Sequence, residues 1–255
     1  MLYVWPLRDD GPAGARPWLT LALMVACTTS SLWLWALPPD AAAAALHGLG
    51  LIPADLAQGW PAPPPGGHSR WMAPLTSLVL HAGWAHLLVN LAYLWLFGRG
   101  LEAVLGPWRL LVLFLASGIA GEICQITAVP SSHLPMIGAS GGISGMLGAH
   151  LLLFPRANIL TLARFWRTSL VIRVPSLLII GAWLAAELLA LVRMDPAAGG
   201  TASLAHLGGF AAGMLLVPLL RTPGLALLQP ARTLAFSAIR HEAAGRSEAC
   251  RPKRD

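Results

Sequence analysis

Charged side chains are scarce in this sequence of 255 residues, where Asp, Glu, Lys and Arg together make up 11% of the chain. Ordinary soluble domains carry about 25% charged residues, whereas this chain is 56% hydrophobic. So little charge excludes an ordinary soluble domain. The composition predicts a polytopic, all-helical membrane protein, because each span needs about 20 apolar residues.

Cysteine is also scarce, and nothing in its placement indicates a structural site. Cys27, Cys124 and Cys250 are far apart and show no paired spacing, so neither a disulfide framework nor a metal knuckle is expected. The formal charge of +6 is spread over short loops and the C-terminal part of the chain. Membrane topology explains this charge better than nucleic-acid binding does. We predict no metal site, no cofactor and no nucleic-acid partner.

Long apolar segments are abundant by contrast, and six of them are long enough or nearly long enough to span a bilayer. The fourth is short, so it reaches the opposite face only if its first residue lies below the membrane surface, in a cavity rather than against lipid. The six predicted spans cover residues 18–37, 75–97, 109–128, 140–154, 174–192 and 203–220.

The basic residues fix the predicted orientation. With a cytoplasmic N-terminus, fifteen of the 17 basic residues fall on the inner side, and only Arg70 and Arg193 fall outside. Both termini are then cytoplasmic, in a multi-pass protein of a bacterial inner membrane. The chain divides into a leader over 1–17, a six-span domain over 18–220 and a basic tail over 221–255, with a long interfacial outer loop over 38–74.

A run of small residues begins the fourth span with Gly138-Ala139-Ser140-Gly141 and continues to Gly145 and Gly148. Small residues at helical spacing allow a neighbouring helix to approach closely in a membrane. A serine at the mouth of such a helix suggests a nucleophile, although serines in spans more often bond a backbone carbonyl. Ser140 therefore needs a partner base before catalysis can be inferred.

The sixth span supplies a candidate base. His206, Gly209 and Gly213 are spaced i, i+3 and i+7, so they share one helix face. Docking this face on the glycine face of the fourth span, formed by Gly141 and Gly145, would bring His206 to Ser140. A neutral imidazole there could accept the serine proton as general base. The alternative is a histidine that bonds a carbonyl near the membrane surface.

The second span carries two candidate hydrogen-bond donors. His86 and Asn90 lie one helical turn apart and face the same way. A tetrahedral intermediate needs donors aimed at its oxyanion. A metal site formed by these two residues and His206 is a weaker reading, because no carboxylate or cysteine lies at ligand spacing beside them.

These motifs together resemble the rhomboid intramembrane serine proteases over about residues 68–220. The resemblance rests on His86-x-x-x-Asn90, Gly138-x-Ser140-Gly141 and Ala205-His206-x-x-Gly209-x-x-x-Gly213 on the second, fourth and sixth spans. Further matches follow the second and fourth spans. They are Phe97-Gly98 with Glu102 and Gly106, and Phe154-Pro155-Arg156.

The resemblance implies a six-span bundle and a serine endopeptidase that cuts transmembrane segments of single-span proteins in the lipid bilayer. It implies Ser140 as nucleophile and His206 as general base, a dyad without an acid. It also implies an oxyanion hole formed by His86, Asn90 and the backbone N–H of Ser140. The alternative is a catalytically silent relative that binds membrane segments for quality control. Such relatives lack the serine or the histidine, and this chain has both.

One departure from the family pattern concerns the support of His206. Some rhomboids have an aromatic residue one turn after the nucleophile, under the histidine, but this chain has Ser144. Close packing at Gly209 and Gly213 is then the expected means of orienting His206. Two carboxylates, Glu122 and Glu187, lie near the predicted depth of the dyad. Either could orient His206, but structural pairing is the favoured interpretation, because the resemblance implies a dyad that works without an acid.

Overall fold

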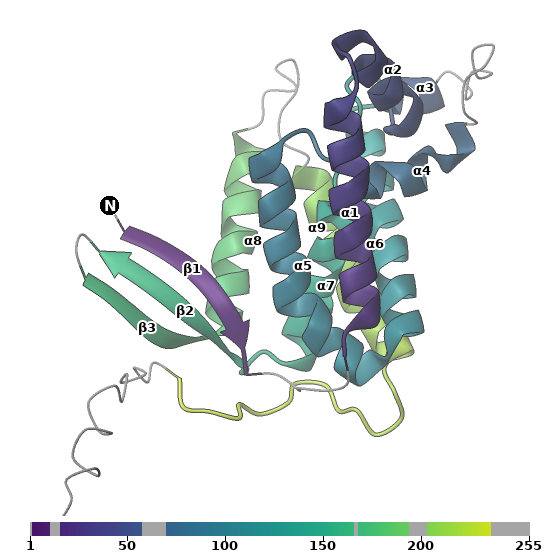
Figure 1. The fold of residues 1–255 in the computed structure, drawn as a ribbon. Coiled ribbons are helices and arrows are strands. Elements are labelled where there is room, and N and C mark those ends of the chain that lie inside the picture. Colours follow the sequence, from purple (N-terminus) through teal and green to yellow (C-terminus); the bar gives the residue numbers. More distant parts are fainter. Residues whose placement is uncertain (1, 11–15, 58–69, 166–167, 194–202, 236–255) are drawn as a thin grey trace, which may run out of the picture.

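A computed structural model of the chain describes residues 2–10, 16–57, 70–165, 168–193 and 203–235. Most of this part is a bundle of helices, drawn in Figure 1. The principal helices are α1 (Trp18–Ala36), α5 (Trp84–Leu105), α6 (Pro107–Ala128), α7 (Ser140–Leu153), α8 (Ser176–Val192) and α9 (Ser203–Leu220).

The helical membrane bundle predicted from the composition is confirmed. Within the described part of the chain, α1, α5, α6 and α9 are long and apolar enough to cross a membrane, and α7 and α8 are shorter apolar helices. α7 has 14 residues. It lies at the centre of the bundle, and every residue from Gly141 to His150 is buried. The shortness predicted for the fourth span is therefore present in the structure.

The second span begins later than the sequence predicts, at Trp84 rather than at residue 75. Residues 73–79 form the short helices α4 (Ala73–Thr76) and η2 (Ser77–Val79), and an extended segment follows as far as Gly83. Side chains of α1 satisfy two carbonyls here: Ser30 donates to Val79 O at 2.7 Å, and Trp35 to His81 O at 3.0 Å. Irregular backbone at this depth is tolerated because the protein satisfies its polar groups.

The loop after α1 forms α2 (Pro39–Leu49), α3 (Pro53–Ala57) and the one-turn helix η1 (Arg70–Met72). These elements lie together at the top of Figure 1, at the opposite end of the bundle from the strands. A β-bridge between Leu51 and Met136 connects the loop to the segment before α7, and Ala54 N donates to Ser132 O of the same segment at 2.9 Å. Residues 61–67 of this loop, which are rich in Pro and Gly, lie outside the described residues.

A three-stranded antiparallel sheet, which was not predicted from the sequence, lies at the other end of the bundle. Its strands are β1 (Leu2–Asp9), β2 (Asn158–Phe165) and β3 (Thr168–Pro175), in the order β1-β2-β3. Asp9 contacts Arg99 of α5 at 3.0 Å, and the backbone N–H of Asn158 donates to Asp10 Oδ1 at 2.7 Å. Residues 2–9 of the expected leader are thus part of the folded structure.

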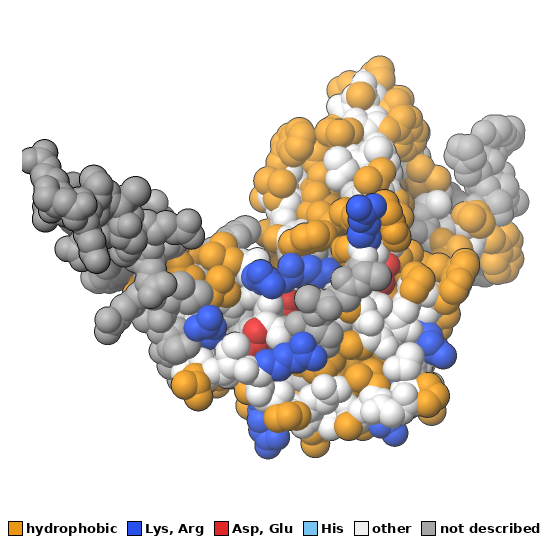
Figure 2. All heavy atoms as spheres, turned by 60° about the horizontal axis from the view of Figure 1, so that its bottom comes forward, with side chains coloured by type: hydrophobic (Ala, Val, Ile, Leu, Met, Phe, Trp, Pro, Cys, Tyr) orange, Lys and Arg blue, Asp and Glu red, His pale blue; other side chains and the backbone are white. Residues whose placement is uncertain are grey.

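The described part of the basic tail, up to residue 235, is tied to the same end of the molecule. Leu228 N donates to Leu152 O at 2.9 Å, and Gln229 N donates to Leu153 O at 2.8 Å. Thr233 bonds Asp10 through its hydroxyl. Figure 2 views this end and shows several basic side chains gathered on it. The face is therefore rich in positive charge.

The first turn of α1 is fixed by a buried carboxylate from α5. Glu102, which is 8% exposed, accepts hydrogen bonds from Leu19 N at 2.9 Å and from Thr20 N at 2.8 Å. Thr20 Oγ1 also donates to Glu102 Oε2 at 2.7 Å. A carboxylate at a helix N-terminus satisfies free N–H groups and complements the helix dipole. Glu102 therefore anchors α1 against α5.

Candidate active site

The site is built around the N-terminus of α7, which begins at Ser140 directly after a sharply turned segment. Gly138 has a φ of +127°, a conformation that side chains disfavour. A Cβ at this position would also lie 2.8 Å from the His86 ring. The backbone N–H of Gly138 donates to Ser77 O at 2.8 Å. These constraints place the Ser140 hydroxyl beside His86 at the end of a helix.

The glycine faces of α7 and α9 lie in direct backbone contact. A Cβ at Gly209 would overlap Gly141 O, and a Cβ at Gly213 would overlap Gly145 O. A Cβ at Gly145 would likewise overlap Ser117 of α6. Small residues thus allow the close approach that stabilises helix pairs in lipid. This packing fixes the height of His206 on α9 relative to α7.

Replacing Gly213 by alanine is expected to lower the free energy of unfolding by about 3 kcal/mol, because the added methyl overpacks two rigid backbones. Denaturation with SDS, followed by circular dichroism, measures this loss. Gly181→Ala in α8 is the matched control, since a Cβ there meets nothing within 4 Å and alanine is the better helix former. Equal stability of the two variants would contradict the packing argument.

Ser140 and His206 lie within hydrogen-bond distance. The Oγ of Ser140 is 2.8 Å from Nε2 of His206, although the two residues are 66 positions apart in the sequence. Ser144, one turn after Ser140, donates its hydroxyl to Ser140 O at 2.7 Å within α7. The arrangement can act chemically as a nucleophile beside its base, since geometry of this kind is what proton transfer requires.

The other side of the His206 ring faces α8. Nδ1 of His206 lies 3.0 Å from Oε1 of Glu187, without the alignment of a straight hydrogen bond. The Trp183 ring lies one turn earlier on α8, with its centroid 6.4 Å from that of His206. An aromatic ring and a carboxylate from the fifth span thus flank the histidine. From the sequence, this support was expected of the glycine packing, and structural pairing was the favoured interpretation of Glu187.

The dyad opens into a cavity of about 190 Å³. Asn90, which is 5% exposed, uses one Nδ2 hydrogen to bond His86 O at 2.9 Å in its own helix. Its amide retains a second hydrogen. Polar side chains from α5, α7, α8 and α9 converge on the cavity, and its polar lining includes His86, Asn90, Tyr93, Ser140, Ser144, Glu187 and His206.

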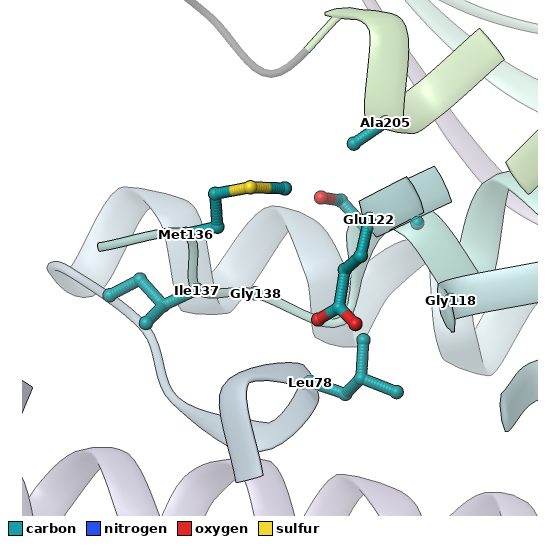
Figure 3. A pocket seen from close by; sticks show the side chains of 9 residues that line it. Leu78, Gly118, Glu122, Met136, Ile137, Gly138 and Ala205 are labelled. Carbon is teal, nitrogen blue, oxygen red and sulfur yellow. The ribbon is translucent and has the colours of Figure 1, made fainter. Parts of the chain in front are cut away.

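A second and smaller cavity, of about 30 Å³, borders Ser140 on another side. Figure 3 shows the Glu122 side chain extending from α6 toward Leu78, among Gly118, Gly138 and Met136. Glu122 Oε1 accepts a hydrogen bond from Ser77 at 2.5 Å. The carbonyl oxygen of Ser77 also accepts the hydrogen bond from Gly138 N. The contact between Glu122 and Ser77 therefore supports the segment that precedes α7.

Structural pairing was the favoured interpretation of Glu187, and the position of Trp183 beside His206 was missed in the sequence, although a signal was present. The two residues lie four positions apart in the fifth span, so they share a helix face. An ionisable residue inside a span is a functional hypothesis by default. A carboxylate and an indole on the same face of a span therefore indicated a functional contact.

Comparison with known proteins identifies some relatives that are named proteases and others that are named inactive. The chain is 44% identical over 82 residues to "Rhomboid protease GluP" of Bacillus subtilis, covering 32% of this chain and 16% of the relative. It is 35% identical over 144 residues to "Rhomboid protein 1, mitochondrial" of Saccharomyces cerevisiae, covering 53% and 38%. It is 37% identical over 75 residues to "Inactive rhomboid protein 1" of Drosophila melanogaster, covering 29% and 5%.

These matches span well under two thirds of each relative's length, so they establish kinship rather than the activity of the whole protein. The family model for the rhomboid domain matches residues 68–223, which is more than half of the chain. That range contains α5 to α9 and every polar residue of the cavity. The chain is a multi-pass membrane protein that belongs to the rhomboid family.

Proposed function

We propose that the protein is an intramembrane serine endopeptidase that cleaves transmembrane segments of membrane proteins with a dyad of Ser140 and His206. The observation that carries the proposal is the distance of 2.8 Å between Ser140 Oγ and His206 Nε2. Both groups face a cavity that polar side chains line. The relatives include one that is named inactive, whereas this chain carries both Ser140 and His206.

The proposed reaction is acyl transfer through a covalent intermediate. Ser140 Oγ attacks the carbonyl carbon of the scissile peptide while its proton passes to His206 Nε2. The carbonyl oxygen becomes an oxyanion that the Ser140 N–H, His86 and Asn90 stabilise by hydrogen bonds. His206 then gives its proton to the leaving amine as the C–N bond breaks. Water, activated by the same histidine, hydrolyses the acyl-enzyme.

The substrate class follows from the depth of the site. At about 1.5 Å per residue, the 14 residues of α7 extend about 21 Å, whereas the hydrocarbon core is about 30 Å thick. Ser140 would therefore lie below the membrane surface, where the cavity could admit water. Peptide bonds at that depth belong to membrane segments, so we propose single-span proteins in the lipid bilayer as substrates.

Reconstitution tests this proposal. The wild-type protein in proteoliposomes is incubated with a panel of single-span substrates, and mass spectrometry locates any cut. Cleavage within or near the membrane segments supports the proposal. If the wild type binds the segments and leaves every one intact, the protein is instead the catalytically silent alternative, a binder of membrane segments.

We also propose that the protein lies in a bacterial inner membrane with both termini in the cytoplasm, because basic residues gather at the end of the bundle that carries the sheet. Single cysteines at Arg156 and Asp40 test this orientation in a variant whose three native cysteines are serine. A membrane-impermeant maleimide should label Asp40→Cys in intact cells, and Arg156→Cys only after lysis. The reverse pattern would overturn the orientation.

A further inference from the structure

We propose that Glu187 of α8 is a positioning residue that holds His206 in the tautomer and orientation needed for proton transfer. This inference rests on the proposed function, and it adds a third group to a pair that the family resemblance describes as a dyad. The geometry behind it is the distance of 3.0 Å between Glu187 Oε1 and His206 Nδ1.

The two nitrogens of the His206 imidazole have different tasks in the proposed reaction. To accept the proton of Ser140, Nε2 must be free of hydrogen, so the neutral ring carries its proton on Nδ1. A proton on Nδ1 needs an acceptor, since burying an N–H without a partner costs free energy. Glu187 Oε1 is within reach, and the His206 side chain is only 20% exposed. The carboxylate therefore selects the tautomer that leaves Nε2 free.

The Glu187 carboxylate is itself held in place. It accepts a hydrogen bond from the side chain of Ser203 at the start of α9. Its own side chain is 16% exposed, so little water competes for it. The contact with Nδ1 is not straight in the free protein, which is common before substrate binds, because catalytic hydrogen bonds tighten in the complex.

Trp183 completes the support from the same helix face. Its ring lies 6.4 Å from His206, centroid to centroid, and 5.8 Å from Phe210 of α9. The Trp183 indole thus supports His206 in place of the aromatic residue that some rhomboids have one turn after the nucleophile, where this chain has Ser144. Together, the indole limits rotation of the ring and the carboxylate fixes which nitrogen carries the proton.

Glu187 stays a carboxylate throughout the proposed reaction. When Ser140 Oγ bonds to the carbonyl carbon, its proton goes to Nε2 and the ring becomes an imidazolium. The negative charge of Glu187, beside Nδ1, stabilises that cation. The proton on Nε2 then leaves with the amine, and Nδ1 keeps its own proton. The residue thus acts through His206 rather than on the reacting atoms.

The test compares Glu187→Gln, Glu187→Asp and the wild type in proteoliposomes, with kcat, KM and the thermal unfolding midpoint measured for each. Leu184→Ala is the matched control for lost packing of α8, because Leu184 packs against the core and lies outside the cavity lining. We expect Glu187→Gln to lower kcat by roughly 10- to 100-fold, as misplacement of a general base does. KM should stay within about twofold, because the lost interaction acts in the transition state.

Two further results belong to the prediction. Glu187→Asp should retain more activity than Glu187→Gln, since it keeps the charge on a shorter side chain. Leu184→Ala should lower the unfolding midpoint while kcat per folded enzyme stays within about twofold of the wild type. An unchanged kcat in Glu187→Gln would overturn the inference. So would a loss of kcat no larger than the loss of folded protein. If the wild type itself cleaves nothing, the proposed function fails instead.

Discussion

Replacing Ser140 by alanine is expected to lower kcat for peptide cleavage by at least about 10⁴-fold, and His206→Ala should have an effect of similar size. The two groups act as a unit, because the attacking Oγ is useless without a base at Nε2, 2.8 Å away. The double variant should therefore be no worse than either single one. Cleavage of a reconstituted single-span substrate, followed over days, measures all three.

A serine outside the cavity provides the control for this experiment. Ser117 lies buried on α6 at the contact with Gly145. Its hydroxyl has no hydrogen-bond partner in the described part of the chain. Ser117→Ala should keep kcat within about twofold of the wild type. If losses for Ser140→Ala and His206→Ala simply multiplied in the double variant, the two residues would act separately and the dyad would be wrong.

Asn90→Ala is expected to lower kcat by about 10²- to 10³-fold, the usual cost of removing one donor from an oxyanion hole. Asn90 lines the cavity beside Ser140, and one of its amide hydrogens is committed to His86 O. The other would stabilise negative charge that develops only during the reaction. Steady-state kinetics should accordingly show a loss in kcat with KM nearly constant.

The matched control replaces a buried asparagine at the opposite end of the molecule. Asn158, which is 1% exposed, bonds Asp10 and Thr233 through its side chain. Asn158→Ala should lower the unfolding midpoint without changing kcat of the folded enzyme. A higher KM at constant kcat in Asn90→Ala would mean that Asn90 binds the ground state, which would remove it from the oxyanion hole.

The helices that carry the site could be predicted from the sequence because their signals are local. Span length and apolar content locate α1, α6, α7, α8 and α9 to within about two residues at each end. The spacing of Gly209 and Gly213 relative to His206 also indicates a helix face, and the structure places that face against α7. Periodicity along one helix is sufficient for such predictions.

The features that could not be predicted depend on contacts between distant segments. β1 forms only because residues 158–165 offer it a partner strand, and neither segment is long or apolar enough to be conspicuous alone. The late start of α5 depends on Ser30 and Trp35, which bond carbonyls about 50 residues away. Tertiary contacts of this kind override local pattern.

The contact of Glu187 with His206 is another feature that depends on segments packing together and could not be predicted from either one alone. The sequence shows that Glu187 lies in a span near the right depth, but it does not show which way α8 is rotated. In α8, which the structure describes throughout, the fully buried residues are Ser176 and Ile180, both in the first two turns. With so few buried positions, the apolar pattern of α8 does not define an inward face.

Covalent labelling of Ser140 tests the central claim most directly. A fluorophosphonate probe reacts with a serine hydroxyl that a neighbouring base activates. We expect the wild-type protein to be labelled, with the adduct located on Ser140 by mass spectrometry, and labelling to be lost in both Ser140→Ala and His206→Ala. A wild-type protein that is not labelled, or labelling that persists in His206→Ala, would contradict a nucleophile activated by His206.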